Sequence, residues 1–355
     1  MTVICGVSAV LADHRYPQAT LTAALAARLL PAGLPDPALL HRLHERTGVA
    51  HRCLALPLPA YAELADFGAA NDAWIEVAGD LGQRALTAAL VQSGLPATAV
   101  DHLVTTTVTG VSAPSLDTHL IASTGLRRDV RRLPLFGLGC VGGAAGLARL
   151  ADLLRGDPDG VGVLLAVELC SLTVQVDDVS VANLVATGLF GDGAAAVVMC
   201  GERRAAELGI AGPRVRASTA ALYPGTERAM GWDVGPSGLR VVLSAQVPAI
   251  VAEQLGPDVR GFLAQHGLST RAIAHWIAHP GGPRVIDAVH TALDLPPAAL
   301  ARTRRSLRDN GNLSSASVLH ILADTLEAEP AGTSEPALLF AMGPGFCSEL
   351  VLLQW

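Results

Sequence analysis

Apolar and polar positions follow two periods along the chain, and the changes between them mark the predicted elements. From residue 72 to residue 95, apolar residues recur every three to four positions, which predicts a long amphipathic helix that Gly94 ends. The next stretch, 100–110, is rich in β-branched residues and predicts a strand. A continuous apolar run at 161–172 predicts a strand buried on both faces. This alternation favours the α/β class.

The same patterns predict further elements in both halves of the chain. They are a first buried strand within residues 1–17, helices at 117–126, 141–160, 243–267 and 314–330, and strands at 130–139 and 272–280. The stretches 189–199 and 335–353 both look like paired strands around glycine turns, which is consistent with an internal duplication. The polar, Gly- and Pro-containing stretch 200–218 predicts a boundary near residue 205, which divides the chain into halves at 1–204 and 205–355.

The composition is that of a globular protein with a sizeable core. The chain has 355 residues, of which 50% are hydrophobic and 16% are charged. It contains no run of about 18 apolar residues, so we expect no membrane span, and its first residues lack the basic start of a signal peptide. The six cysteines show no C-x-x-C spacing, which favours reduced thiols in the cytoplasm and no structural metal.

The charge pattern limits the possible partners. The net charge is −7, and all 25 basic residues are arginine. The overall field of such a protein repels nucleic acid and anionic lipid, so we expect neither as a partner. An anionic substrate therefore has to be held by a local group of arginines.

The stretch "GLGCVGGAAG", residues 137–146, allows several interpretations. Three of its glycines fit the G-x-G-x-x-G of a dinucleotide-binding loop, and Glu168 ends the next strand, where a ribose-binding acid would sit. Alternatively, Cys140 is a nucleophile at a strand-to-helix turn, where unpaired N–H groups and the helix dipole lower the pKa of its thiol below about 8.5. The third interpretation is a small buried cysteine without chemistry.

Two later stretches favour the nucleophile. In "HWIAHPGGP", His279 ends an apolar strand before a Pro-Gly-Gly turn, although a surface histidine is the plainer alternative. In "RDNGNLSSAS", Asn312 stands in a tight turn before a helix, where an ordinary N-cap is the plainer alternative. A cysteine, a histidine and an asparagine at element ends suit thiolate activation beside an oxyanion site.

The motifs "GCVGG", "LFGDGAAAVV", "WIAHPGGP", "GNLSSAS" and "MGPG" together resemble the type III polyketide synthases, the chalcone synthase superfamily. The resemblance runs from about residue 40 to the C-terminus. It implies a thiolase fold, in which two similar α/β halves stack as αβαβα layers, and it implies a homodimer. The stretches around Cys140 and Glu168 resemble the bacterial branch, particularly the enzymes that make alkylresorcinols and alkylpyrones.

Matched position by position, the resemblance assigns roles to four residues. Cys140 would take an acyl group from coenzyme A as a thioester, and His279 would pair with its thiolate. Asn312, together with His279, would polarise the malonyl thioester carbonyl and stabilise the enolate that decarboxylation forms. Phe190 would be the aromatic gatekeeper beside the malonyl carboxylate, a role that is compatible with plain core packing. CoA thioesters are substrates in this scheme, so no cofactor is expected.

The resemblance also places a CoA entrance. Arg42 and Arg46 match two basic positions of the family's CoA tunnel, whereas a third basic position is Leu39 here. From its placement after "HPGGP", Arg284 is a candidate to replace that third position. Solvated surface charge is the alternative role for all three arginines.

The expected substrate cavity departs from chalcone synthase at several positions. Gly343, Pro344 and Gly345 match the loop that shapes the cyclisation cavity, and Thr173 is retained. The positions that differ from the family pattern are Val108, Ala113, Cys170 and Val241, and Trp232 is a candidate to fill part of the cavity. Smaller apolar side chains leave room for an aliphatic chain, which predicts a fatty acyl starter.

The sequence therefore predicts an acyltransferase that loads an acyl-CoA on Cys140, extends it with malonyl-CoA and cyclises it to a resorcinol or an α-pyrone. One alternative uses malonyl-CoA alone and makes tetrahydroxynaphthalene or dihydroxyphenylacetyl-CoA. A ketoacyl-carrier-protein synthase of type III shares the Cys/His/Asn set, and a dinucleotide-binding oxidoreductase or an inactive structural partner remain the alternatives from other classes.

Overall fold

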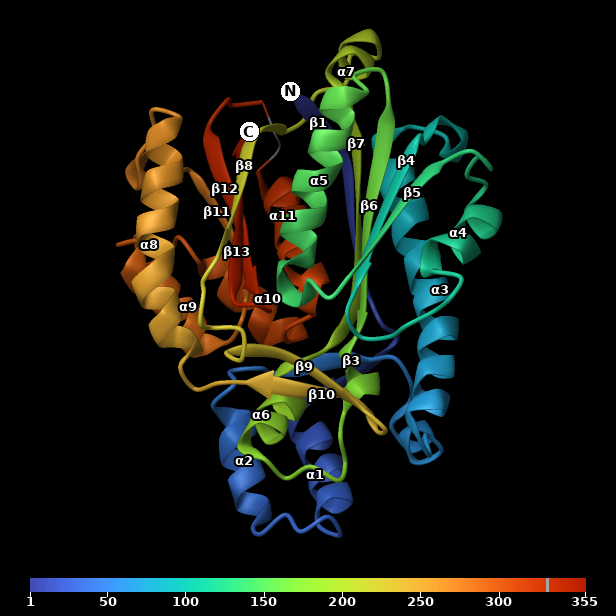
Figure 1. Ribbon diagram of the computed structural model, residues 1–355, viewed down its shortest axis with the longest axis vertical. Coiled ribbons are helices and arrows are strands. Elements are labelled where there is room, and N and C mark those ends of the chain that lie inside the picture. Colours follow the sequence, from blue (N-terminus) through green and yellow to red (C-terminus); the bar gives the residue numbers. More distant parts are fainter. Residues whose placement is uncertain (330–331) are drawn as a thin grey trace.

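Two buried helices, α5 (Gly142–Gly156) and α11 (Ser317–Ala328), form the central layer of the protein. The computed structural model describes residues 1–329 and 332–355. In Figure 1, strands from the first half of the chain lie on one side of these helices and strands from the second half on the other. One apolar core joins α5 and α11 to both groups of strands, so the middle of the molecule is its most continuous packed region.

Each half adds a group of strands and an outer layer of helices. The strands of the first half are β1 (Thr2–Leu11), β4 (His102–Thr107), β5 (Arg131–Phe136), β6 (Val161–Leu169) and β7 (Asp192–Cys200). Those of the second half are β8 (Arg214–Leu222), β11 (His275–Ala278), β12 (Pro336–Gly343) and β13 (Cys347–Gln354). The outer helices are α3 (Phe67–Ser93) and α4 (Leu116–Thr124) on the first half, and α8 (Val247–Gln265), α9 (Pro283–Ala292) and α10 (Ala301–Asn310) on the second.

The pairing of the strands repeats between the halves. In the first half β4 and β6 are parallel, and β6–β7 and β7–β1 are antiparallel. In the second half β11 and β12 are parallel, and β12–β13 and β13–β8 are antiparallel. A short antiparallel pairing of β1 with β8 joins the two groups into one nine-stranded sheet. The layers therefore follow the order αβαβα, and the expected duplicated architecture is confirmed.

A smaller lobe covers one end of the strands, below them in the view of Figure 1. Its helices are α1 (Gln18–Leu29), α2 (Pro37–Glu45) and α6 (Val181–Leu189). Its strands form two antiparallel pairs, β2 (His14–Pro17) with β3 (His51–Leu54), and β9 (Met230–Gly235) with β10 (Gly238–Leu243).

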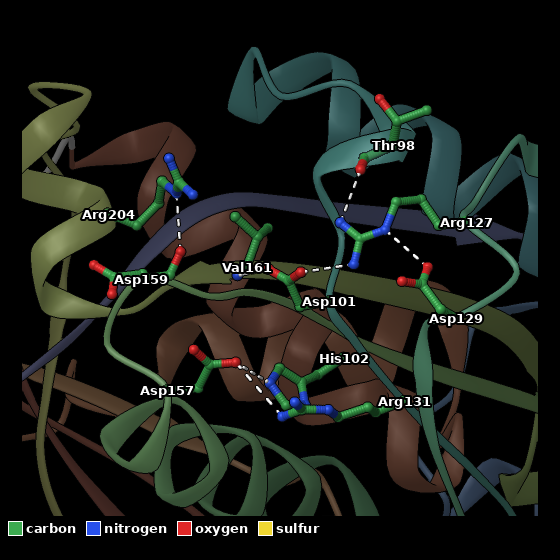
Figure 2. Close-up of polar contacts among 10 residues, drawn as sticks. All are labelled: Thr98, Asp101, His102, Arg127, Asp129, Arg131, Asp157, Asp159, Val161 and Arg204. Atoms are coloured by element: carbon green, nitrogen blue, oxygen red, sulfur yellow. Dashed lines mark hydrogen bonds and ion pairs between the residues drawn. The ribbon is translucent and has the colours of Figure 1, made fainter.

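A network of charges fixes the opposite end of three parallel strands (Figure 2). Asp101, just before β4, accepts hydrogen bonds from Val161 N at 2.9 Å and from the Arg127 guanidinium at 2.9 Å. His102 and Asp157 lie 2.9 Å apart, between Nε2 and Oδ2. Since these residues stand where β4 and β6 begin, they align the strands whose carboxyl ends carry the candidate site described below.

Most of the predicted elements are present, and one prediction is corrected. Helix α3 ends at Gly94, whose φ of 70° is left-handed, as the sequence indicates. The predicted pairing within 189–199 is wrong: β7 is one strand between β1 and β6, while 335–353 does form a hairpin. Residue 205 lies inside the short helix α7 (Glu202–Glu207), so the passage between the halves follows it, at 208–213.

The predicted helix at 314–330 begins as a 3-10 turn before α11, and its last residue lies outside the described residues. Within the described part of the chain, no helix is both long and apolar enough to cross a lipid bilayer.

Candidate active site

Cys140 lies in a 3-10 turn, Gly139–Val141, between β5 and the buried helix α5. The glycines around it are required by close packing. A side-chain carbon on Gly139, whose φ is 52°, would lie 2.8 Å from the Pro344 ring, and one on Gly143 would lie 2.2 Å from Ser315 O. Protein atoms thus occupy the space that a cofactor phosphate would need, and the dinucleotide interpretation of this loop is wrong.

Asn312 faces this turn from the second half of the molecule. Its main chain is fixed beside Phe190, because Asn312 N donates to Leu189 O at 2.9 Å and Gly191 N donates to Asn312 O at 3.0 Å. Its side-chain oxygen accepts from Ser314 N at 2.8 Å. The amide nitrogen Nδ2 is therefore the group left to donate. Asn312 is not the N-cap of α11, since that position is taken by Ala316 after a further 3-10 turn, Ser314–Ala316.

The electrostatics of Cys140 differ from the sequence-based expectation. The pKa of its thiol is raised to about 12, chiefly by burial and also by the nearby Glu168 carboxylate, while hydrogen bonding to the Ser314 and Asn312 side chains acts in the opposite direction. The prediction that the helix start alone lowers this pKa is therefore wrong. The raised pKa favours a neutral thiol, and the two side chains that oppose the shift belong to the second half.

His279 directly follows β11, and its side chain is buried. Its backbone N–H donates to Phe340 O at 3.0 Å, which extends the β11–β12 pairing by one residue. Among the described residues, neither ring nitrogen has a hydrogen-bond partner. Burial lowers the pKa of His279 to about 3, so the ring is neutral and offers one donor and one acceptor to a bound molecule. A surface position for His279 is excluded.

Glu168 is a link between the halves rather than a ribose ligand. It is fully buried at the end of β6 and accepts from Val108 N at 3.1 Å and Thr109 Oγ1 at 3.0 Å. It also accepts from the hydroxyl of Ser315, in the turn that follows Asn312. Burial raises the pKa of Glu168 to about 7. Its carboxyl therefore sets the position of the Asn312 turn relative to the end of β6.

Two neighbouring cavities bring most of the predicted substrate residues together. A cavity of about 250 Å³ is lined by Val108, Trp232, Pro344 and Gly345 among others. A cavity of about 20 Å³ is lined by Cys170, Thr173, Phe190, Trp232 and Val241 among others. Trp232 lines both cavities and is the cross-strand neighbour of Val241 in the β9–β10 pair.

Two of the predicted cavity positions lie elsewhere. Gly343 packs against the Gly139–Val141 turn that carries Cys140, and a side-chain carbon on Gly343 would lie 2.8 Å from Val141 N. Ala113 is exposed in the loop before α4. Gly343 therefore shapes the site through the backbone, and Ala113 is accessible on the surface of the single chain.

A third cavity, of about 410 Å³, is the candidate for the CoA entrance. Arg46 and Arg284 both line it, from the two halves of the chain, and Met230 is shared between it and the 250 Å³ cavity. Arg42 is separate: its guanidinium lies 3.6 Å from Asp36, and its side chain is 56% exposed. The structure thus brings two of the three predicted arginines to one cavity.

Sequence reasoning missed the residues that support the site. Ser314 and Ser315 were visible in the "GNLSSAS" motif, and Glu168 ends an apolar strand where a carboxylate has to be explained. Met230 and Arg52, which borders the 20 Å³ cavity, give no local signal. Among the described residues, no cluster of three metal-ligating side chains occurs.

Known proteins resemble this chain along its whole length. The family model of the chalcone and stilbene synthases matches with its N-terminal domain at residues 65–203 and its C-terminal domain at 214–355. A 1,3,6,8-tetrahydroxynaphthalene synthase of Streptomyces peucetius subsp. caesius is 53% identical, with 100% of this chain and 93% of that protein covered. A putative chalcone synthase of Bacillus subtilis is 36% identical, with 87% of each chain covered.

A crystal structure supports the same relationship. The 1,3,6,8-tetrahydroxynaphthalene synthase of Streptomyces coelicolor A3(2), described as a bacterial type III polyketide synthase, superposes with a TM-score of 0.91 at 30% identity. The superposition covers 99% of each chain. The fold and the order of the two halves are therefore common to both proteins.

Proposed function

Because the chain belongs to the chalcone and stilbene synthases, the type III polyketide synthases of the thiolase fold, we propose that it condenses malonyl-CoA alone into a tetrahydroxynaphthalene-type product. The 53% identical relative, a tetrahydroxynaphthalene synthase, supports this alternative over the fatty acyl starter that small cavity residues suggested. The observation in the structure that carries the proposal is Trp232, whose position between the 250 Å³ and 20 Å³ cavities favours a small starter over a long chain.

Loading would begin at the 410 Å³ entrance. Arg46 and Arg284 are suited to bind the phosphates of coenzyme A, because a guanidinium pairs with phosphate oxygens in a forked geometry. At the foot of the path the Cys140 proton passes to the neutral His279 ring. The sulfur attacks the thioester carbonyl, a carbon–sulfur bond forms, and coenzyme A leaves as the thiol. The start of α5 and the donors of Ser314 and Asn312 stabilise the transient sulfur anion.

Decarboxylation and condensation would use the same groups. The bond between the malonyl methylene and carboxylate carbons breaks, carbon dioxide leaves, and the electron pair moves onto the thioester oxygen as an enolate. Asn312 Nδ2 and a His279 N–H donate to that oxygen. The enolate carbon attacks the Cys140 thioester, a carbon–carbon bond forms, and the thiolate is released. The apolar ring of Phe190 disfavours the carboxylate and favours neutral carbon dioxide.

The expected homodimer is part of this proposal. Strand β5 is at the edge of the nine-stranded sheet, with Leu133 and Phe136 37% and 55% exposed. An exposed edge strand with apolar side chains is a template for pairing with a second copy. Phe136 also lines the 250 Å³ cavity, so a partner at this edge would close the reaction space. All six cysteines are free, which fits our proposal of a cytoplasmic protein.

The test compares starters. We expect the purified protein with malonyl-CoA alone to release carbon dioxide and to give one aromatic product by mass spectrometry, and added fatty acyl-CoA to change that product little. Trp232→Ala joins the two cavities and should raise incorporation of a hexanoyl starter about tenfold. A wild-type protein that forms product only after an acyl-CoA starter is added would favour the resorcinol or pyrone alternative.

A further inference from the structure

Arg52, in β3, is buried between the small lobe and the candidate active site, and one of its nitrogens has no partner. Its Nε donates to Gln18 Oε1 at 3.0 Å, and its Nη1 donates to Phe190 O at 2.7 Å. The residue is only 3% exposed. Within the described residues, Nη2 makes no hydrogen bond. A buried donor without an acceptor is costly, so an oxygen atom is expected to fill this position in the working protein.

The space beside Arg52 has room for one oxygen atom. Arg52 borders the cavity of about 20 Å³, which is large enough for a single water-sized group. Phe190 and Trp232 border the same cavity, and Trp232 also lines the 250 Å³ cavity. An oxygen atom that enters the small cavity beside Trp232 therefore lies next to Arg52.

The other polar side chains of this cavity have already used their donors. Thr173 Oγ1 donates to Cys170 O at 2.8 Å, and Thr187 Oγ1 donates to Leu184 O at 2.9 Å. Asn183 Nδ2 donates to Gln175 O and Asp178 O, at 2.7 Å and 2.6 Å. Apart from the Trp232 indole, Arg52 Nη2 is thus the nitrogen or hydroxyl donor left among the described residues that line this cavity.

A chain built from malonyl units carries a keto oxygen on every second carbon, and keto oxygens only accept hydrogen bonds. Val108, Cys170 and Val241 offer such oxygens apolar carbon or a weak thiol. A guanidinium gives a stronger, charge-assisted hydrogen bond. Burial lowers the pKa of Arg52 to about 10 and the nearby Asp192 carboxylate opposes that shift, so the guanidinium is protonated at neutral pH.

We propose that Arg52 Nη2 binds one keto oxygen of the growing polyketide chain beside Trp232 and so holds the chain in position until it reaches full length. This inference rests on the proposed function and names a residue that would position its intermediates. Arg52 takes no part in bond making at Cys140. Its loss should release the chain early, as short lactones, rather than stop carbon dioxide release.

The experiment measures the ratio of full-length aromatic product to short pyrones made from malonyl-CoA. Arg52→Met removes the donor, and Ala186→Val fills the 20 Å³ cavity while leaving the bonds of Arg52 to Gln18 and Phe190 in place. We expect the ratio to fall about tenfold in both variants. Arg84→Met is the matched control, because Arg84 is a half-exposed arginine that pairs with Asp13 away from this cavity, and it should leave the ratio within about twofold of the wild type.

Several outcomes would overturn the role of Arg52. An unchanged ratio in a folded Ala186→Val protein would overturn it, even if Arg52→Met failed to fold. That result would mean that Arg52 serves the separate 530 Å³ cavity that it also borders, or that it binds only a water. A wild-type protein that releases no carbon dioxide contradicts the proposed function, whereas an active one with unchanged ratios contradicts only this inference.

Discussion

The two halves of the molecule present the same structural feature to the site and use it differently. Each half begins its buried helix with a 3-10 turn, Gly139–Val141 before α5 and Ser314–Ala316 before α11. The first turn carries the sulfur of Cys140. The second follows Asn312 and supplies donors to that sulfur. A duplicated fold thus provides two matching helix starts in contact, and the chemistry arises from what differs between them.

The burial of the two turns shows why both are needed. Cys140 alone is in an environment that disfavours a thiolate, with a pKa raised to about 12 by burial. The hydrogen bonds that oppose this shift come from the second half, as does the neutral imidazole of His279. The three candidate residues are therefore divided between the halves, with Cys140 in the first and His279 and Asn312 in the second.

The largest effect on polyketide formation is expected when Cys140, the residue that distinguishes the turn of the first half, is replaced. Cys140→Ala should lower polyketide formation at least about a thousandfold, because no acyl intermediate can form. Carbon dioxide release from malonyl-CoA should continue, since its donors belong to the second half. Mass spectrometry of the intact protein supplies the control: an acyl adduct that persists in this variant, or that maps to another cysteine, would contradict the division of labour.

The next effect concerns the second half. Asn312→Ala removes one of two donors to the enolate and should lower carbon dioxide release by about a hundredfold to a thousandfold. Loading of Cys140 should persist and be visible as an acyl adduct. Asn312→Asp keeps the shape and changes the donor to an acceptor, so it should be equally impaired. Undiminished decarboxylation in both variants would remove Asn312 from this role.

Glu168 tests the connection between the halves through pH. Its carboxyl keeps a proton up to about pH 7 in the folded protein, against 4.5 in the unfolded chain. The folded state binds more protons between these values, so the stability that Glu168 contributes is complete below about pH 4.5 and is lost as pH rises through 7.

The change across this pH range is about 3 kcal/mol at most. Glu168→Gln, which cannot ionise, should remove this slope from thermal unfolding measured between pH 5 and 7.5. Equal slopes in the variant and the wild type would show that Glu168 does not titrate in this range.

The smallest effect compares arginines at the entrance. Arg46→Ala and Arg284→Ala, one from each half, should each raise the KM for malonyl-CoA about tenfold with kcat little changed, because both line the entrance cavity. Arg42→Ala is the matched control, since Arg42 faces Asp36. If Arg42→Ala raises KM as much as the other two, the entrance lies on a different face of α2.

The sequence revealed where the candidate residues stand along the chain better than it revealed their surroundings. Cys140, His279 and Asn312 each stand at an element end, which local patterns reveal, and long periodic helices such as α3 were found within a few residues. The hairpin within 189–199 was wrong because Phe190 and Gly191 pair with Asn312, more than a hundred residues away, instead of with their neighbours. Such non-local pairing leaves no periodic trace.

The direction in which the pKa of Cys140 shifts could not be predicted from the sequence either. The helix start at Cys140 was visible, but the burial that outweighs it depends on how Pro344 and Ser315 close over the turn. The place of Trp232 in the lining of both the 250 Å³ and the 20 Å³ cavity depends likewise on the β9–β10 pair, which the patterns did not predict. Gly- and Arg-containing strands with few buried residues carry little hydrophobic periodicity.

The sheets of the two halves meet along β1 and β8 through just two residue pairs, Thr2 with Val215 and Val3 with Arg214, in the described chain. Much of the contact between the halves is therefore the apolar core around α5 and α11. A cavity created in this core by a large-to-small substitution, far from any reacting atom, would let the two groups of strands shift relative to each other. The enzyme would then lose activity through misalignment of its halves at temperatures well below its unfolding temperature.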